Sequence, residues 1–245
     1  LFPYTTLFRS VFGEGDGLPG LIVDWYNGVA VIQPHSAGME QMADALAALL
    51  QQLLKNKLKA VFLKNKGDGR MLFGDAPCPI EVNEHGYKFL VDWQQGQKTG
   101  FFIDQRENRQ LLAHYAEGKA VLNTFSYTGG FSVYAAKSGA SLVHSVDSAT
   151  NAIALLDENL RLNKAAKHHQ SFEADVFDYL KGAEQAYDII VLDPPAFAKH
   201  KSARHNALMA YKRLNQMAME KLPPKGLLFT FSCSQVVTPN LFYNT

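Results

Sequence analysis

A cysteine between two serines follows a short apolar run near the end of the chain. The run is Gly226-Leu-Leu-Phe-Thr, which is typical of a buried strand, and it continues as Phe231-Ser-Cys-Ser-Gln. Most free cysteines are buried and inert, so packing is one interpretation of Cys233. The polar neighbours and the position at a strand end instead favour partial exposure, which a reactive thiolate needs. Cys233 is therefore a candidate nucleophile, whereas Cys78 lies in a proline-flanked loop and is expected to be structural.

The preceding apolar strand ends in a second candidate group, Asp193, which is followed by Pro194, Pro195, Ala196 and Phe197. Two prolines fix φ and remove two backbone donors, so the chain leaves the strand rigidly and holds the carboxylate at its end. One interpretation is a stiff exit from the strand with Phe197 in the core. The other is a loop that grips a planar base, with Asp193 bonded to the base edge and Phe197 stacked on its face.

A glycine-containing turn follows the first strand of the same series. The strand at 120–125 leads into Ser126-Tyr-Thr-Gly-Gly130 and then into a helix. Such a turn lets the backbone approach a ligand closely, although two glycines before a helix are often only a turn. The next strand ends in Asp147, at the distance from the turn where an acid is positioned to bind ribose hydroxyls. Asp175 and Asp193 end the following two strands; each alone is usually a helix cap, but together they indicate a nucleotide-like site, with a dehydrogenase still possible.

Strands and helices alternate along the second part of the chain, after Gly96. Alternation of this kind predicts an α/β fold with a mostly parallel sheet covered by helices on both faces. The predicted strands are 120–125, 142–147, 170–175, 187–193 and 226–231. The predicted helices are 104–115, 130–138, 149–162, 176–181 and 203–221. Because open α/β sheets bind ligands outside the carboxyl ends of their strands, the candidate groups are expected at one edge.

The part of the chain before this series, residues 11–96, is predicted to form a small α+β unit. Asn27-Gly28 between two apolar runs is a strong hairpin signal, because both central positions of a type I′ turn need positive φ. An amphipathic helix is expected over 39–54, with Ser36 as its N-cap. Its apolar stripe is formed by Met42, Leu46, Leu49, Leu50 and Leu53. The other elements are a strand at 60–64 and a second hairpin at 80–83 and 87–92.

Composition sets limits on the function. The 245 residues are 47% hydrophobic and 19% charged, which is ordinary for a globular protein large enough to bury a core. A net charge of +1 gives no overall signal for nucleic acid, so an RNA site would have to be a local patch. Two widely separated cysteines give neither a disulfide framework nor metal-ligand spacing, so a reducing cytosol is the default location and no metal is expected. No apolar run approaches the length of a membrane span.

Both ends of the sequence are expected to be cut. The first ten residues, LFPYTTLFRS, lack the features of a signal peptide and resemble the translation of a common sequencing adapter. We interpret them as an assembly scar and leave them out of the expected fold. The chain ends at Phe-Tyr-Asn-Thr, without a helix cap or a closing strand.

These motifs together resemble the RlmI family, which are bacterial S-adenosylmethionine-dependent methyltransferases of cytosine carbon 5 in 23S ribosomal RNA. The resemblance covers about residues 12–245, and its most specific stretches are FSYTGGF and TFSCS. The stretches that carry it are 84–86, 91–100, 104–106, 123–131, 193–197 and 230–234. It implies a Rossmann-like class I methyltransferase domain over 97–245, preceded by the small α+β domain over 11–96. It also implies that an N-terminal PUA domain and the last strands of a seven-stranded sheet are absent here.

The resemblance implies roles for individual residues. The turn at 126–130 would hold the methionine part of S-adenosylmethionine, Asp147 the ribose and Asp175 the adenine amino group. Cys233 would attack carbon 6 of cytosine, which activates carbon 5, and Asp193 would bond to the base near N3. The full cofactor-binding set is Phe125, Ser126, Tyr127, Thr128, Gly129, Gly130, Asp147, Ser148, Asp175, Val176, Asp193 and Lys98. The expected RNA contacts are Pro194, Pro195, Phe197, Lys199 and Arg106.

Basic residues in two parts of the chain are candidates for binding RNA phosphates. The first group, after the Asp-Pro-Pro loop, is Lys199, Lys201, Arg204, Lys212 and Arg213. The second group, in the small domain, is Lys55, Lys57, Lys59, Lys64 and Lys66, for which a merely solvated face is an equal alternative. Two rival functions stay open. One is an N-methyltransferase of adenine or guanine, which uses a similar Asp-Pro-Pro-aromatic loop, and the other is an inactive fragment that only binds RNA or cofactor.

Overall fold

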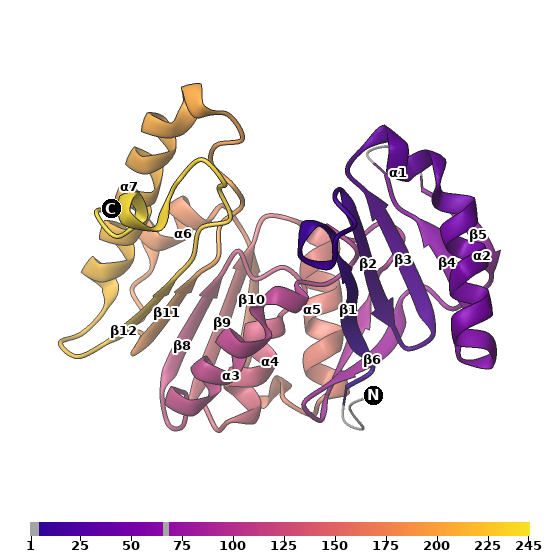
Figure 1. Ribbon diagram of the computed structural model, residues 1–245. Coiled ribbons are helices and arrows are strands. Elements are labelled where there is room, and N and C mark those ends of the chain that lie inside the picture. Colours follow the sequence, from indigo (N-terminus) through magenta and orange to yellow (C-terminus); the bar gives the residue numbers. More distant parts are fainter. Residues whose placement is uncertain (1–4, 66–68) are drawn as a thin grey trace. The chain divides into compact units, whose positions relative to one another are not determined.

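The computed structural model describes residues 5–65 and 69–245, which fall into two compact units (Figure 1). Unit 1 comprises Leu1–Arg106 and unit 2 comprises Glu107–Thr245. The division falls after Arg106, whereas the sequence analysis places the boundary after Gly96. Lys98 and Arg106 therefore belong to unit 1, and the other expected site residues belong to unit 2. Among the described residues, no helix is long and apolar enough to span a membrane.

Unit 2 contains a five-stranded, fully parallel sheet in the order β10-β9-β8-β11-β12 (Figure 1). Its strands are β8 (Ala120–Thr124), β9 (Leu142–Asp147), β10 (His169–Glu173), β11 (Ile189–Leu192) and β12 (Leu227–Thr230). The predicted α/β fold is confirmed. The chain starts in the middle at β8, adds β9 and β10 on one side, and crosses to the other side for β11 and β12. Sheets of this kind bind ligands at the reversal, outside the carboxyl ends of the central strands.

Helices cover both faces of this sheet because its strands carry apolar side chains in both directions. The helices are α3 (Arg106–Tyr115), α4 (Gly130–Lys137), α5 (Thr150–Leu162), α6 (Val176–Gly182), α7 (Arg204–Lys221) and α8 (Pro239–Phe242). α3 and α4 pack on the face that carries Val121 and Val191. α6 and α7 pack on the opposite face, which carries Leu122 and Leu192. α5 contacts β9 and β10, and α8 contacts α7.

The expected elements of unit 2 are present, with shifts at their ends. The strand expected at 170–175 begins one residue earlier and ends at Glu173. β12 ends at Thr230, so Cys233 lies in the loop three residues beyond the strand and not at its end. Short 3-10 turns precede or follow several elements of both units. They are Gly13–Asp16, Lys55–Lys57, Ile103–Gln105, Ala166–His168 and Lys201–Ala203.

Unit 1 contains a mixed sheet in the order β1-β2-β3-β4-β5 and a separate β6-β7 pair. Its strands are β1 (Leu7–Phe12), β2 (Leu21–Tyr26), β3 (Val29–Pro34), β4 (Ala60–Leu63), β5 (Arg70–Gly74), β6 (Ile80–Glu84) and β7 (Tyr87–Val91). β3 and β4 run parallel, and the other neighbours run antiparallel. Both predicted hairpins are confirmed, and Asn27 (φ 47°) and Gly28 (φ 104°) have the positive φ that a type I′ turn needs.

Two strands of unit 1 are absent from the sequence-based prediction. β1 includes residues 7–10, which we left out of the expected fold, yet Leu7 is fully buried and the strand pairs with β2. Their exclusion from the fold is therefore wrong for this chain. β5 lies at the other edge of the sheet, and most of its side chains are exposed. Because β5 buries no alternating face, it gives no strand signal in the sequence.

The helix expected over 39–54 is two helices, α1 (Ala37–Gln41) and α2 (Ala43–Leu54). The predicted N-cap is confirmed, because Ser36 Oγ accepts a hydrogen bond from the Met39 N–H at 3.3 Å. The predicted apolar stripe is partly wrong. The residues that face the sheet are Ala43, Leu46, Ala47, Leu50 and Leu54. Met42, Leu49 and Leu53 are exposed, because the packed face of α2 is centred on Ala43, Ala47, Leu50 and Leu54.

Candidate active site

The carboxyl edge of the unit 2 sheet brings the candidate groups together. The turn at 125–130 follows β8, Asp147 ends β9 and Asp193 follows β11. Asp175 lies two residues beyond β10, and Cys233 three residues beyond β12. The strands that carry these groups are neighbours in the sheet, so the predicted placement at one edge is observed.

The turn after β8 has a constrained backbone. Phe125, Tyr127 and Gly129 have positive φ values of 51°, 46° and 81°. The left-handed region is unfavourable for the two residues that are not glycine, and such conformations cluster at functional sites. A Cβ at Gly129 would lie 2.7 Å from Cγ of the buried Leu156, so packing as well as φ requires glycine there.

The two aspartates expected at the cofactor each bond to backbone amides. Asp147 accepts hydrogen bonds from the N–H groups of Tyr127 (2.8 Å) and Ala149 (2.9 Å), so its carboxylate fixes the turn. Asp175 caps α6, because its Oδ1 accepts from the N–H groups of Phe177 (2.9 Å) and Asp178 (3.1 Å). The helix-cap interpretation of a strand-end aspartate is thus observed at Asp175. A capping carboxylate retains further lone pairs with which it can accept bonds from a ligand.

Several buried polar atoms around the turn have no hydrogen-bond partner among the described residues. They include Asn123 Oδ1, Ser126 Oγ and Thr128 Oγ1. The Asn123 amide is oriented by its Nδ2, which donates to Ser132 Oγ at 2.8 Å. Native proteins leave few such atoms, and each calls for a compensating partner or a functional reason. The chemistry of the turn therefore fits a polar ligand better than an apolar one.

Cys233 is exposed and lies against the Asp-Pro-Pro loop. Its thiol donates to the Pro194 carbonyl oxygen, with Sγ 3.7 Å from that atom. The two loops start side by side because Leu192 is paired with Thr230, and the Phe231 N–H donates to the Leu192 carbonyl at 2.9 Å. The interpretation of Cys233 as a buried core residue is therefore wrong.

The second cysteine has a different environment. Cys78 lies in unit 1 and donates from Sγ to Asp92 Oδ1 at 3.2 Å. Partial burial raises the pKa of the Cys78 thiol to about 11. A thiol with that pKa is almost entirely protonated at neutral pH and is a poor nucleophile.

Phe197 packs into unit 2. Its ring centroid lies 4.7 Å from that of Tyr211 and 6.5 Å from that of Phe177, and the side chain is half-buried. This arrangement favours the core interpretation of Phe197 over a platform on which a base stacks. Pro194 is buried beside it, whereas Pro195 is exposed.

The first group of basic residues is available to a partner. Its members Lys199, Lys201, Arg204, Lys212 and Arg213 are all exposed. The sequence from Pro194 to Met219 contains neither aspartate nor glutamate, so no acid within this stretch offsets the positive charge. The Arg213 guanidinium lies over the Phe177 ring at 5.5 Å, which holds one of these cations in place.

The basic residues of unit 1 that were expected at the site are mostly engaged within the unit. Arg106 Nε lies 3.0 Å from a carboxylate oxygen of the fully buried Glu84, so an RNA contact would have to break a buried ion pair. Lys98 pairs with Asp104 at 3.1 Å. Lys64 donates to the carbonyls of Trp93 and Gly96, and burial lowers its pKa. Lys55, Lys57 and Lys59 are exposed, and Lys66 lies outside the described residues.

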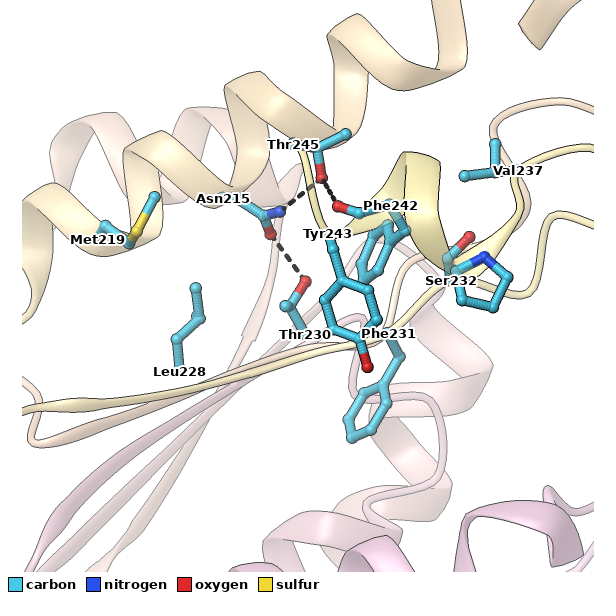
Figure 2. Close-up of a pocket in the computed structure, with 11 residues that line it drawn as sticks. Asn215, Met219, Leu228, Thr230, Phe231, Ser232, Val237, Phe242, Tyr243 and Thr245 are labelled. Atoms are coloured by element: carbon cyan, nitrogen blue, oxygen red, sulfur yellow. Dashed lines mark hydrogen bonds between the residues drawn. The ribbon is translucent and has the colours of Figure 1, made fainter.

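A pocket of about 520 Å³ lies along β12 (Figure 2). Thr230 donates to Asn215 Oδ1 at 2.7 Å, and the Asn215 amide donates to Thr245 Oγ1 at 3.2 Å across it. The lining residues are Asn215, Met219, Leu228, Thr230, Phe231, Ser232, Val237, Pro239, Phe242, Tyr243 and Thr245. Ser232 adjoins Cys233, but none of the expected cofactor-binding residues lines the pocket. The pocket therefore belongs to the β12 edge of the sheet.

Ser234 and Tyr211 were given no role of their own from the sequence. Ser234 is buried and its Oγ lies 3.1 Å from the hydroxyl of Tyr211, which is also buried. In the sequence, Ser234 is only a polar neighbour that favours exposure of the cysteine, whereas Ser234 itself is buried. Tyr211 gave no signal, since an aromatic residue on the inner face of a helix usually fills the core.

Known proteins resemble this chain over nearly its whole length. It is 40% identical, over 97% of its length, to ribosomal RNA large subunit methyltransferase I of Shewanella frigidimarina. It is 38% identical, over 98% of its length, to the ribosomal RNA large subunit methyltransferase of Deinococcus radiodurans. The chain spans only 63% of each of these two relatives. The crystal structure of SMU.776 complexed with SAH has a TM-score of 0.89 at 33% identity, covering 98% of this chain and 65% of that one.

The chain also matches the sequence model of a whole protein family. The sequence model of the S-adenosylmethionine-dependent methyltransferases matches residues 11–245. That range includes the turn after β8, the Asp-Pro-Pro loop and Cys233. This chain belongs to the S-adenosylmethionine-dependent methyltransferase family.

Proposed function

We propose that this chain transfers a methyl group from S-adenosylmethionine to carbon 5 of a cytosine in 23S ribosomal RNA. The observation that carries the proposal is the exposed thiol of Cys233, which contacts the Asp193-Pro194 loop at the carboxyl edge of the sheet. The names of the relatives from Shewanella frigidimarina and Deinococcus radiodurans support ribosomal RNA as the substrate class. A bacterial enzyme with this substrate works in the cytoplasm, where ribosomal RNA is made.

The turn after β8 would hold the cofactor. Ser126 and Thr128 have hydroxyls that need partners, and the methionine part of S-adenosylmethionine is rich in polar groups. Asp147 and Asp175 follow at the ends of the next two strands, where they would accept bonds from the ribose hydroxyls and the adenine amino group. Phe125, Ser148 and Val176 adjoin these groups in the chain. When bound, the cofactor supplies an electrophilic methyl group.

The reaction needs a nucleophile because carbon 5 of cytosine is unreactive in the free base. The Cys233 thiolate adds to carbon 6, forming an S–C bond and moving the double-bond electrons toward carbon 5. Asp193 bonds to the base near N3, which stabilises the adduct. After carbon 5 has gained the methyl group, a base removes its proton. The C–H electrons restore the double bond as sulfur leaves with the S–C pair.

The exposed basic stretch beyond the Asp-Pro-Pro loop would bind the RNA backbone. Lys199 and Lys201 follow the loop directly, and Arg204, Lys212 and Arg213 continue along α7. Because these side chains meet phosphates and not base edges, they would add affinity and salt dependence but little sequence preference.

The test is nucleoside mass spectrometry of 23S ribosomal RNA incubated with the 245-residue chain and cofactor. We expect 5-methylcytosine with the parent chain and with Cys78→Ala, and none with Cys233→Ala. The Cys78 variant is a matched control because it removes the other cysteine thiol of the chain, which belongs to unit 1. Methylation that persists in Cys233→Ala, or that lies on an exocyclic amine of adenine or guanine, would contradict the cytosine mechanism. Calorimetric titration that detects no S-adenosylmethionine binding would contradict the enzyme function of this chain.

A further inference from the structure

The loops that follow β11 and β12 are joined at two consecutive residues. The Cys233 thiol donates to the Pro194 carbonyl at 3.7 Å. The Ala198 N–H donates to the hydroxyl of Ser234 at 3.4 Å. One loop carries the candidate base-binding carboxylate and the other the candidate nucleophile. The second contact therefore bears on how the two groups face each other.

Tyr211 of α7 supports the Ser234 end of this junction. Its hydroxyl lies 3.1 Å from Ser234 Oγ, and the exposed fractions of the two residues are 0% and 4%. The Tyr211 ring packs against the rings of Phe197 and Phe242, with centroid distances of 4.7 Å and 5.3 Å. A buried hydroxyl has to be satisfied, so packing alone would be served as well by phenylalanine and alanine. The polar pair instead ties helix α7 to both loops at once.

We infer that Ser234 and Tyr211 are positioning residues that fix the direction in which Cys233 presents its thiol to the base. The inference rests on the proposed function, because it assigns them to the same methyl transfer. They act by holding the 231–235 segment against the Asp-Pro-Pro loop, so that the thiol reaches carbon 6 of a base bonded to Asp193.

The test compares Ser234→Ala, Ser234→Thr and Tyr211→Phe, all in the Cys78→Ala background. Tyr187→Phe is the matched control: its hydroxyl bonds to Tyr179 and His144, both at 2.8 Å, but it precedes β11 at the opposite end of the strands. Two rates are measured. One is single-turnover methyl transfer with saturating RNA and cofactor, and the other is iodoacetamide alkylation of Cys233, followed by mass spectrometry.

We expect the two rates to move in opposite directions. Displacing a reacting atom by about 1 Å costs on the order of 100-fold in rate, so Ser234→Ala and Tyr211→Phe should slow methyl transfer by about 10- to 100-fold. Losing one hydrogen bond should free the thiol and speed alkylation by about 3- to 10-fold. Cofactor affinity should stay within about twofold of the parent, because the turn after β8 is untouched. Ser234→Thr keeps the hydroxyl and should restore both rates, and Tyr187→Phe should change neither.

Two results would overturn the inference. One is that Ser234→Ala and Tyr211→Phe behave like Tyr187→Phe in both rates. The other is that methyl transfer slows while the alkylation rate of Cys233 stays at the parent value, since the thiol would then be unmoved. Failure of the proposed function has its own signature, which is methylation that survives Cys233→Ala. Alkylation needs no RNA, so it still decides the positioning role in that case.

Discussion

Replacing Gly129 by alanine tests whether the turn after β8 is built for a ligand. An alanine there must adopt φ near 81°, which costs about 1–2 kcal/mol for a residue with a Cβ. Its Cβ would also lie 2.7 Å from Leu156 Cγ, and Leu156 is fully buried and cannot swing away. Overpacking of this kind costs a further 1–3 kcal/mol or so. Gly129→Ala should therefore destabilise unit 2 by about 2–5 kcal/mol in total.

Gly118→Ala is the matched control because it isolates the backbone contribution. Gly118 also lies in unit 2 with positive φ, at 67°, but a Cβ there would meet nothing within 4 Å. It should lose only the left-handed cost of about 1–2 kcal/mol. The difference between the two variants, roughly 1–3 kcal/mol, is the contribution of the Leu156 contact.

The assay must report on unit 2 alone. Both tryptophans, Trp25 and Trp93, lie in unit 1, so tryptophan fluorescence is unsuitable. Hydrogen exchange of β8 and β9 peptides in increasing urea gives the free energy of unfolding of unit 2, and calorimetry gives the affinity for S-adenosylmethionine. We expect Gly129→Ala to weaken cofactor binding at least about tenfold and Gly118→Ala to leave it unchanged. Equal destabilisation by the two variants would refute the packing argument, and parental affinity in Gly129→Ala would refute the assignment of the turn.

Three further predictions concern charged and polar groups. Asp175→Ala should destabilise unit 2 by about 1 kcal/mol through loss of the α6 cap, while Asp175→Ser should retain the cap. Calorimetry that finds weaker cofactor binding in both variants would support the contact between Asp175 and adenine. Parental affinity in both variants would contradict that contact. Burial lowers the pKa of His169 to about 4, so the unfolded state binds more protons between pH 6.5 and 4. The contribution of His169 to the free energy of unfolding is therefore greatest above pH 6.5 and falls by about 3 kcal/mol toward pH 4. Urea titrations of His169→Gln should lack this part of the loss, and a pH profile unchanged from the parent would contradict the prediction. Arg106→Ala should destabilise unit 1 by about 3–5 kcal/mol because it removes the Arg106 guanidinium from the buried Glu84 carboxylate. Urea unfolding followed by tryptophan fluorescence should show that adding Glu84→Ala partly restores the free energy of unfolding of unit 1. Parental stability of the Arg106→Ala variant would show that the ion pair does not stabilise the unit.

Much of unit 2 was predictable from the sequence because its strands are short apolar runs that end in recognisable groups. The turn at 126–130, Asp147 and Asp193 lie where alternation of strands and helices places them. Cys233 was expected at a strand end but lies three residues beyond it, because β12 stops at Thr230. β12 ends close to the end of its neighbour β11 at Leu192, which is followed by Asp193 and two prolines that have no N–H to donate, and the sequence of β12 alone does not show this.

The sequence gives less information where a side chain has two plausible partners. Arg106 and Lys64 are cations on a chain expected to bind RNA, yet both are satisfied within unit 1, by Glu84 and by two backbone carbonyls. Phe197 is similar, since a ring that could stack on a base packs against Tyr211 instead. Residue type indicates what each group can bind. Only the fold decides which partner lies within reach.

The reversal of strand order between β8 and β11 divides the segments of the candidate site into two groups. Segments after β8, β9 and β10 would meet the cofactor, which all members of a methyltransferase family share. Segments after β11 and β12 would meet the substrate, which differs between members. Only Asp193 is expected to meet both ligands, so substitutions in 194–199 and 231–232, which leave Asp193 and Cys233 in place, would change the accepted substrate without disturbing the cofactor turn. The same sheet can therefore diverge toward new targets by changes in two short loops.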